Sequence, residues 1–146
     1  MPVILLASPG QIFRHTRYYH DATGWHTKYL LVLAADTNDI VYRLLTSRAH
    51  ARPEAPPCYH GDPYPGFSLG LLGGSLSAKS WLDLRRQDDY DYRQFAADLT
   101  GGLVTPETNL PHPLLCAALD CAANADDTSQ QQTRLMRDQR ARLGCI

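Results

Sequence analysis

Four residues with chemically useful side chains stand close together at the end of one apolar run. Thr46 and Ser47 carry hydroxyls, Arg48 carries a fixed positive charge and His50 carries an imidazole, all within five residues. The arginine fork matches the geometry of a phosphate, and an imidazole can take up or release a proton near neutral pH. Residues of these types at this spacing predict a site that binds a phosphate group.

A predicted hairpin must position this cluster. Apolar and β-branched residues fill positions 29–33 and 40–45, and turn-forming residues occupy 36–39 between them. Two such runs joined by a short loop are typical of antiparallel strands. Lys28 and His26 stand just before the first strand, so we expect them to meet the cluster at adjoining strand ends.

The other elements are predicted from periodicity and from the positions of proline and glycine. We expect strands at 11–19, 67–72 and 76–84, a turn at 21–24, a turn or bulge at the glycines of 70–74, and an edge strand at 3–6. Residues 51–66 contain five prolines and are predicted to form a surface loop.

Helical spacing predicts a short helix at 90–99 that stops at Gly101, and a second helix with Pro113 in its first turn. Thr105 with Pro106 has the appearance of a helix cap. Positions 126–146 are polar and basic. They are expected to form either an exposed helix from about Ser129 or a disordered tail, beside a domain that spans 1–125.

Length and composition predict one soluble domain. At 146 residues, with 44% hydrophobic and 20% charged residues, the composition is that of an ordinary globular protein. No apolar run approaches the roughly 20 residues of a membrane span, and the opening run is too short for a typical signal peptide. These features predict a cytoplasmic protein that does not contact a membrane.

Positive charge gathers in the first third of the chain, although the net charge is only −1. Six basic residues face three acidic ones between positions 14 and 52, and such a patch attracts polyanions. The aromatic rings of the following loop could stack on unpaired bases or simply pin the loop. The candidate contacts to RNA are Arg14, Arg17, Arg48, Arg52, Tyr59 and His60.

The four cysteines form no CxxC pair. In a chain without secretory features we expect reduced, mostly buried thiols rather than a disulfide framework. A zinc site built from Cys58, His60 and His112 is an alternative, although the regular ligand spacing is missing. We therefore expect neither a metal nor a cofactor in the site.

The order of these segments resembles the MazF/PemK family of toxin–antitoxin toxins over roughly positions 9–123. The Pro-Gly-Gln-Ile of positions 9–12 is similar to the family's PGDI-type start, with Gln11 where an acidic residue is frequent. Lys28 and Tyr29 stand where the family has Arg-Pro, and Thr46 with Ser47 matches its Thr-Ser or Thr-Thr. The resemblance implies an α+β fold: a small antiparallel SH3-like β-barrel with flanking helices and a C-terminal helix.

The resemblance also implies a function, the toxin of a type II toxin–antitoxin system. Such a toxin cleaves single-stranded RNA without a metal, is silenced by an antitoxin protein and often forms a homodimer. Cleavage requires a base for the ribose 2′-hydroxyl, neutralisation of the phosphorane charge, and a proton for the departing oxygen. The candidates are His26 or His50 as acid and base, Lys28 and Arg48 as phosphate clamps, and the hydroxyls of Thr46 and Ser47, which position the phosphate or pass a proton.

Two other functions fit the same pattern. One is a barrel that binds nucleic acid or protein without chemistry, which is favoured by Lys28 at the family's Arg-Pro position. The other is a toxin of the same fold that poisons DNA gyrase through a C-terminal tripeptide containing tryptophan. This chain ends Gly-Cys-Ile, which argues against the gyrase poison.

Overall fold

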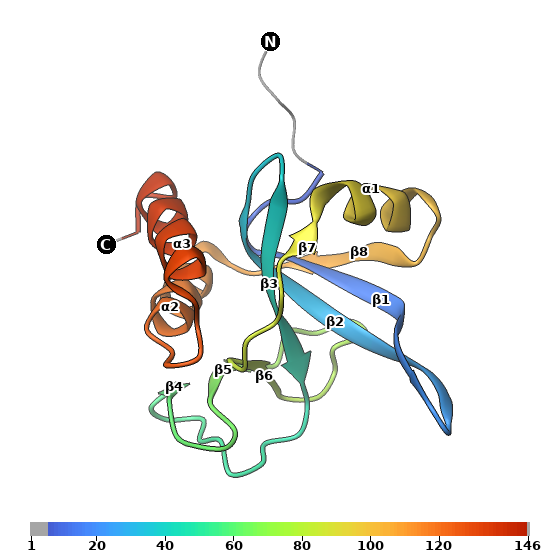
Figure 1. Ribbon diagram of the computed structural model, residues 1–146. Coiled ribbons are helices and arrows are strands. Elements are labelled where there is room, and N and C mark those ends of the chain that lie inside the picture. The colour runs from blue at the N-terminus through green and yellow to red at the C-terminus, as the bar shows by residue number, and fades with distance from the viewer. Residues whose placement is uncertain (1–5, 146) are drawn as a thin grey trace.

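The computed structural model describes residues 6–145, which form an α+β fold with an antiparallel sheet of eight strands and three helices (Figure 1). The predicted edge strand at 3–6 falls almost entirely outside the described residues. In chain order the elements are β1 (Gln11–Asp21), β2 (Gly24–Ala35), β3 (Asp39–Thr46), β4 (Cys58–Tyr59), β5 (Gly66–Gly70), β6 (Ser80–Asp83), β7 (Tyr90–Asp91), α1 (Tyr92–Thr100), β8 (Val104–Asn109), α2 (His112–Ala123) and α3 (Gln130–Arg142).

The sheet is an open, fully antiparallel one. Its strands are ordered β4-β5-β6-β3-β2-β1-β8, and β7 pairs with β3 beside this path. Among the described residues no pairing joins the outer strands β4 and β8. Closure into an SH3-like barrel therefore stays a prediction.

The predicted first strand and the central hairpin are confirmed. β1 and β2 run on past the rest of the sheet as a projecting hairpin at the lower right of Figure 1. The turn from β2 to β3 is fixed by Asp36, whose carboxylate accepts hydrogen bonds of 2.8 Å from the backbone N–H groups of Asn38 and Asp39. Tyr29 pairs with Leu45 in this hairpin. Lys28 and Thr46, the adjacent residues, therefore lie at the same end of it.

The apolar runs of these strands are continuous because both faces of the sheet are covered. Successive side chains of a strand point to opposite faces. Leu31 and Leu33 lie in the larger core, with residues of α2 and α3, whereas Val32 lies in a second core with Phe95 of α1. The helices thus hold both faces of the strands that carry the candidate site.

One predicted element is wrong. Thr105 and Pro106 do not begin a helix but lie in strand β8, where Pro106 pairs with Phe13 of β1. A proline has no backbone N–H, so it cannot donate the hydrogen bond that an inner strand makes to its second neighbouring strand. β8 is an outer strand with one neighbour, so the proline is tolerated there.

The two predicted helices are confirmed, and the tail takes the helical alternative. Gly101 caps α1, and Pro113 lies in the first turn of α2. Ser129 caps the start of α3, because its hydroxyl accepts a hydrogen bond from the N–H of Gln132, and Met136 of α3 is fully buried in the larger core. Within residues 6–145 no helix has both the length and the apolar character needed to cross a membrane.

A buried arginine joins the sheet to the last helix. Arg43 of β3 is inaccessible to solvent, and it donates hydrogen bonds to the carbonyl of Tyr42 and, at 2.7 Å, to the side-chain oxygen of Gln132 in α3. A buried charge is stable only when such partners satisfy it. Burial lowers the pKa of Arg43, and the nearby carboxylates of Asp127 and Asp89 oppose this shift.

The prediction of reduced thiols is wrong for this structure. Cys58 of β4 is bonded to Cys121 of α2, and Cys116 of α2 is bonded to Cys145. The alternative zinc set of Cys58, His60 and His112 is not brought together, because His60 lies with the first pair and His112 with the second. Partners 63 and 29 residues apart leave no spacing pattern that sequence inspection could find.

Candidate functional site

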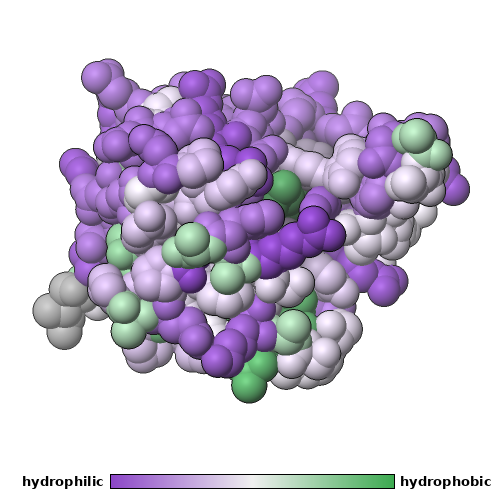
Figure 2. All heavy atoms as spheres, turned by 90° about the horizontal axis from the view of Figure 1, so that it is seen from below, coloured by the Kyte–Doolittle hydropathy of each residue, from purple (hydrophilic) through white to green (hydrophobic). Residues whose placement is uncertain are grey.

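The adjoining ends of β2 and β3 open into a cleft of about 530 Å³, called here the basic cleft. Figure 2 shows the molecule from below the view of Figure 1, the side toward which the end of β3 points. This face is mainly hydrophilic, with only small, separate apolar areas. The charged and imidazole groups of the cleft are four cations, two histidines and one carboxylate: Lys28, Arg48, Arg52, Arg85, His26, His50 and Asp83.

The cleft brings together all five predicted catalytic residues. Lys28 and Thr46 come from paired strand ends, and Ser47 and His50 follow Thr46 along its wall. The Thr46 hydroxyl accepts a hydrogen bond of 3.1 Å from the backbone N–H of Arg48. This bond fixes the oxygen while leaving the hydroxyl proton available to a bound anion.

One wall of the cleft is built around Asp83, at the end of β6. Its buried carboxylate accepts a bidentate pair from Arg85, with the shortest bond, 2.7 Å, from Nη2 to Oδ2, and lies 3.4 Å from Nη2 of Arg52. The hydrogen bond to Asp83 raises the pKa of Arg85, whereas burial lowers that of Arg52. Asp83 is paired with Arg52 and Arg85, and Lys28 and Arg48 add two further positive charges. The cleft as a whole is therefore positive.

Arg52 is part of the wall rather than a mobile contact. It is 4% exposed, and it donates to the backbone carbonyls of Pro65 and Arg48, each at 3.1 Å. Gly66 makes room for it, since a Cβ at position 66 would lie 2.4 Å from Cδ of Arg52. Arg85, with a side chain 53% exposed, is the arginine of this pair that an incoming anion can reach.

His50 is held in the cleft by an aromatic stack. Its ring lies on Tyr64, with ring centroids 4.4 Å apart, and the guanidinium groups of Arg52 and Arg85 lie 5.3 and 5.2 Å from the Tyr64 ring. The backbone of His50 and Ala51 takes the left-handed conformation, with φ of 47° and 67°. Two successive non-glycine residues in this region cost on the order of 1 kcal/mol or more each. The turn is closed by a hydrogen bond of 2.8 Å from the N–H of Arg52 to the carbonyl of Ala49.

His26 also lines the cleft, and it belongs to the projecting hairpin. Its Nε2 lies 2.9 Å from both the Asp21 carboxylate and the Thr23 hydroxyl, and its ring stacks on Tyr19 at 4.4 Å. Hydrogen bonds from Thr23 and then from His26 lower the pKa of Asp21 to about 2. The ammonium of Lys28 lies 5.6 Å from the same Tyr19 ring. An ionised carboxylate therefore orients one imidazole, as a positioned acid or base requires.

Four of the predicted RNA contacts lie outside the cleft lining. Arg14 is an exposed residue of β1, and Arg17 stacks over Trp25 on the hairpin. Tyr59 lies against Gly61, and His60 turns to the disulfide of Cys58 and Cys121. His60 thus contacts α2 through Cys121, whereas the contact of Tyr59 with Gly61 lies within the proline-rich loop.

Asp83, Arg85 and Tyr19 are cleft residues that sequence reasoning did not select. Asp83 and Arg85 are far from the hydroxyl cluster in sequence, and the pairing of β3 with β6, Leu45 with Leu82 and Thr46 with Trp81, brings the two ends together. The available signal was a carboxylate at the end of an apolar strand, followed two residues later by a cation.

Compared with known proteins, the chain matches no protein-family model, no curated protein and no solved structure. The chemistry available to the cleft follows from its own side chains. Cations and hydroxyls suit a phosphate, and two imidazoles held from different walls suit the transfer of protons to and from it.

Proposed function

We propose that this chain is a metal-independent endoribonuclease that cleaves single-stranded RNA and acts as the toxin of a type II toxin–antitoxin system. The observation that carries the proposal is the meeting of Lys28, Thr46 and Ser47 with both imidazoles in one positively charged cleft. The resemblance to the MazF/PemK family rests on the same Thr-Ser pair.

Each group of the cleft has a task in the proposed reaction. One imidazole removes the proton of the ribose 2′-hydroxyl, and the resulting oxygen attacks the neighbouring phosphorus. Lys28, Arg48 and Arg85 balance the charge of the phosphorane, and Thr46 and Ser47 donate hydrogen bonds to its oxygens. The other imidazole protonates the departing 5′-oxygen, leaving a 2′,3′-cyclic phosphate on one fragment. No redox change or added cofactor enters this scheme.

The proposal includes the finer features that the family resemblance implies. The sheet is taken as an SH3-like barrel that works in the cytoplasm as a homodimer, with an antitoxin protein as its inhibitor. The projecting β1–β2 hairpin supports a role in binding, because its exposed Tyr19 and Trp25 can stack on unpaired bases beside the cleft.

The alternative is a barrel that binds nucleic acid or protein without chemistry. Both imidazoles already have partners, His26 with Asp21 and Thr23, and His50 with Tyr64. Positioning of this kind serves catalysis, but it also occurs where a histidine merely completes a binding surface.

The decisive test is incubation of the antitoxin-free protein with mixed-sequence single-stranded RNA in excess EDTA, with chemical identification of the new ends. We expect fragments ending in 2′,3′-cyclic phosphate. Thr46→Ala and Lys28→Ala should each lower the cleavage rate by about 100-fold, since each removes a group that stabilises the transition state.

Lys79→Ala is the matched control for Lys28→Ala. Lys79 is the other lysine of the chain, pairs with Glu54 on the surface and does not line the cleft. Its substitution should leave the rate unchanged. Intact RNA with folded protein that still binds it would establish the binding module instead, and equal loss in all three variants would remove the assigned roles.

A further inference from the structure

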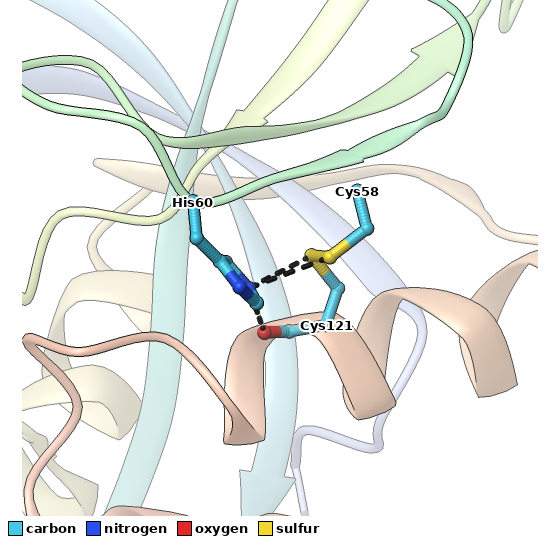
Figure 3. A group of neighbouring side chains, drawn as sticks. All are labelled: Cys58, His60 and Cys121. Atoms are coloured by element: carbon cyan, nitrogen blue, oxygen red, sulfur yellow. Dashed lines mark hydrogen bonds between the residues drawn. A yellow bond between two sulfur atoms is a disulfide. The ribbon is translucent and has the colours of Figure 1, made fainter.

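Two groups of two sulfurs and one imidazole each include a cysteine of α2, and neither lines the basic cleft. The first, called the Cys58 trio, consists of Cys58 of β4, His60 just after it, and Cys121 of α2 (Figure 3). His60 Nε2 lies 3.4 Å from Sγ of Cys58 and 3.5 Å from Sγ of Cys121. The imidazole nitrogen is thus directed at both sulfurs of one disulfide.

These nitrogen–sulfur distances are those of a tetrahedral zinc site. Zinc bonds of about 2.3 Å to sulfur and about 2.0–2.1 Å to nitrogen at tetrahedral angles separate the two ligand atoms by about 3.5 Å. Only the two sulfur atoms must move, from the bonded distance to about 3.8 Å. Their Cα atoms, 5.8 Å apart, belong to elements already held together by the fold.

The surroundings of the trio fit a metal with one open position. Cys121 is buried, Cys58 is partly buried and His60 is exposed. The site is therefore shielded from water at Cys121 and open to water at His60. His60 Nε2 has one further polar contact, a hydrogen bond of 3.0 Å to the backbone carbonyl of Cys121. Metal binding would replace this hydrogen bond, and the ring proton would then be on Nδ1. Because the ring is exposed, Nδ1–H can donate a hydrogen bond to water.

The same composition occurs a second time in the chain. His112 and Cys116 stand four residues apart on α2, with Nε2 and Sγ 3.5 Å apart, and Cys145 completes the group. Residues at this spacing share one helix face. Every cysteine of the chain therefore belongs to a trio of two sulfurs and one imidazole. A histidine beside one disulfide is unremarkable, but a repeat that uses all four cysteines indicates a ligand set.

We propose that the Cys58 trio binds Zn²⁺ when its disulfide is reduced, through two thiolates and His60 Nε2, with water in the fourth position. A cellular dithiol supplies the two electrons and two protons that convert the disulfide into two thiols, and it becomes a disulfide itself. Zinc then displaces the two thiol protons as it binds. Disulfide and zinc are alternative links between the same two elements.

The link matters for the basic cleft because Cys58 lies in the loop that carries Arg52 and Tyr64. In either state β4 stays attached to α2, so the cleft wall keeps its position when the disulfide is reduced. The zinc site does not depend on the proposed ribonuclease activity and is tested without it.

The test is titration of the reduced protein with Co²⁺, a coloured substitute for Zn²⁺, without oxygen and in the presence of a phosphine reductant. The Cys116→Ser/Cys145→Ser variant isolates the Cys58 trio. We expect the absorption bands of tetrahedral Co²⁺ and a thiolate-to-cobalt charge-transfer band that saturate at one ion per chain, with bleaching by Zn²⁺. The oxidised protein should show neither band.

His60→Ala in this background should weaken Co²⁺ binding by about 100-fold or more, because loss of a ligand costs at least as much as loss of its outer-shell partner. His112→Ala is the matched control and should bind like its parent. Equal binding by the His60→Ala variant, or spectra without thiolate charge transfer, would overturn the proposal. So would a reduced chain that loses its circular dichroism and does not regain it with Zn²⁺.

Discussion

The basic cleft and the α2 sulfur groups use histidine in opposite ways. In the cleft, His26 and His50 come from different walls and are held by a carboxylate, a hydroxyl and stacked rings. In the sulfur groups, His60, which follows β4, and His112 of α2 lie against sulfurs that are covalently joined. The histidines of the cleft therefore serve an open site. Those of the α2 region, meaning α2 and the two disulfides that join it to Cys58 and Cys145, lie beside crosslinks of the chain. The contrast teaches that the role of a histidine depends on the groups that contact it and hold it in place, and not on the residue type alone.

Reducing the disulfides should produce the largest change in stability. In the loop-entropy description, closing 63 residues stabilises the fold by about 4 kcal/mol and closing 29 by about 3.5 kcal/mol. Cys58→Ser/Cys121→Ser should therefore lower the free energy of unfolding slightly more than Cys116→Ser/Cys145→Ser. Urea denaturation of both variants in EDTA measures this. A loss below about 1 kcal/mol in both would show that the α2 region does not depend on its crosslinks.

Removing the carboxylate of the cleft wall should rank second. Asp83→Ala leaves Arg52 buried without its ion partner, and breaking a buried pair costs about 3 kcal/mol or more. Asp88→Ala is the matched control, because that side chain is 98% exposed and lies 4.0 Å from Arg86. It should cost less than about 0.5 kcal/mol. If the two variants lose the same stability in urea, the wall does not rely on Asp83.

The smallest expected effect concerns the pH dependence of the hairpin. The pKa of Asp21 is lowered from 3.8 to about 2, first by Thr23 and then by His26. Because the folded-state pKa is depressed, the contact is fully present above pH 3.8 and is lost as the pH falls through about 2. NMR titration should show the Asp21 carboxylate protonating near pH 2, below the usual range of an aspartate.

Thr23→Val should raise the pKa of Asp21 more than His26→Ala does, since the Thr23 hydrogen bond is the larger cause. An unchanged titration in both variants would show that Asp21 does not hold His26 in the cleft. The cleft and the α2 region would then differ less than the structure indicates.

Local patterns were enough to predict the central hairpin and the helices. The runs around the Asp36 turn and the helical spacing of Phe95 and Leu99 need only near neighbours in the sequence. β8 was missed because Thr105 and Pro106 look like a cap locally, and only its outer place in the sheet makes the proline acceptable.

The site was predictable only in part, for the same reason. Thr46, Ser47, Arg48 and His50 are close in sequence, and the strand pairing adds Lys28 and His26. Asp83 and Arg85 reach the cleft through pairing of β3 with β6, which no local pattern specifies. The disulfide partners likewise depend on tertiary packing. Cys58 of β4 lies against Cys121 of α2, and Cys145, which follows α3, lies against Cys116 of α2.

Arg43 ties the burial of one face of β3 to the packing of α3 against it. Its partner Gln132 lies 89 residues later in the chain, in the last helix. While the ribosome still holds that helix, the guanidinium must remain in water, because a buried charge without partners costs several kcal/mol. A chain in which α3 has not yet packed onto the sheet therefore keeps this face of β3 uncovered.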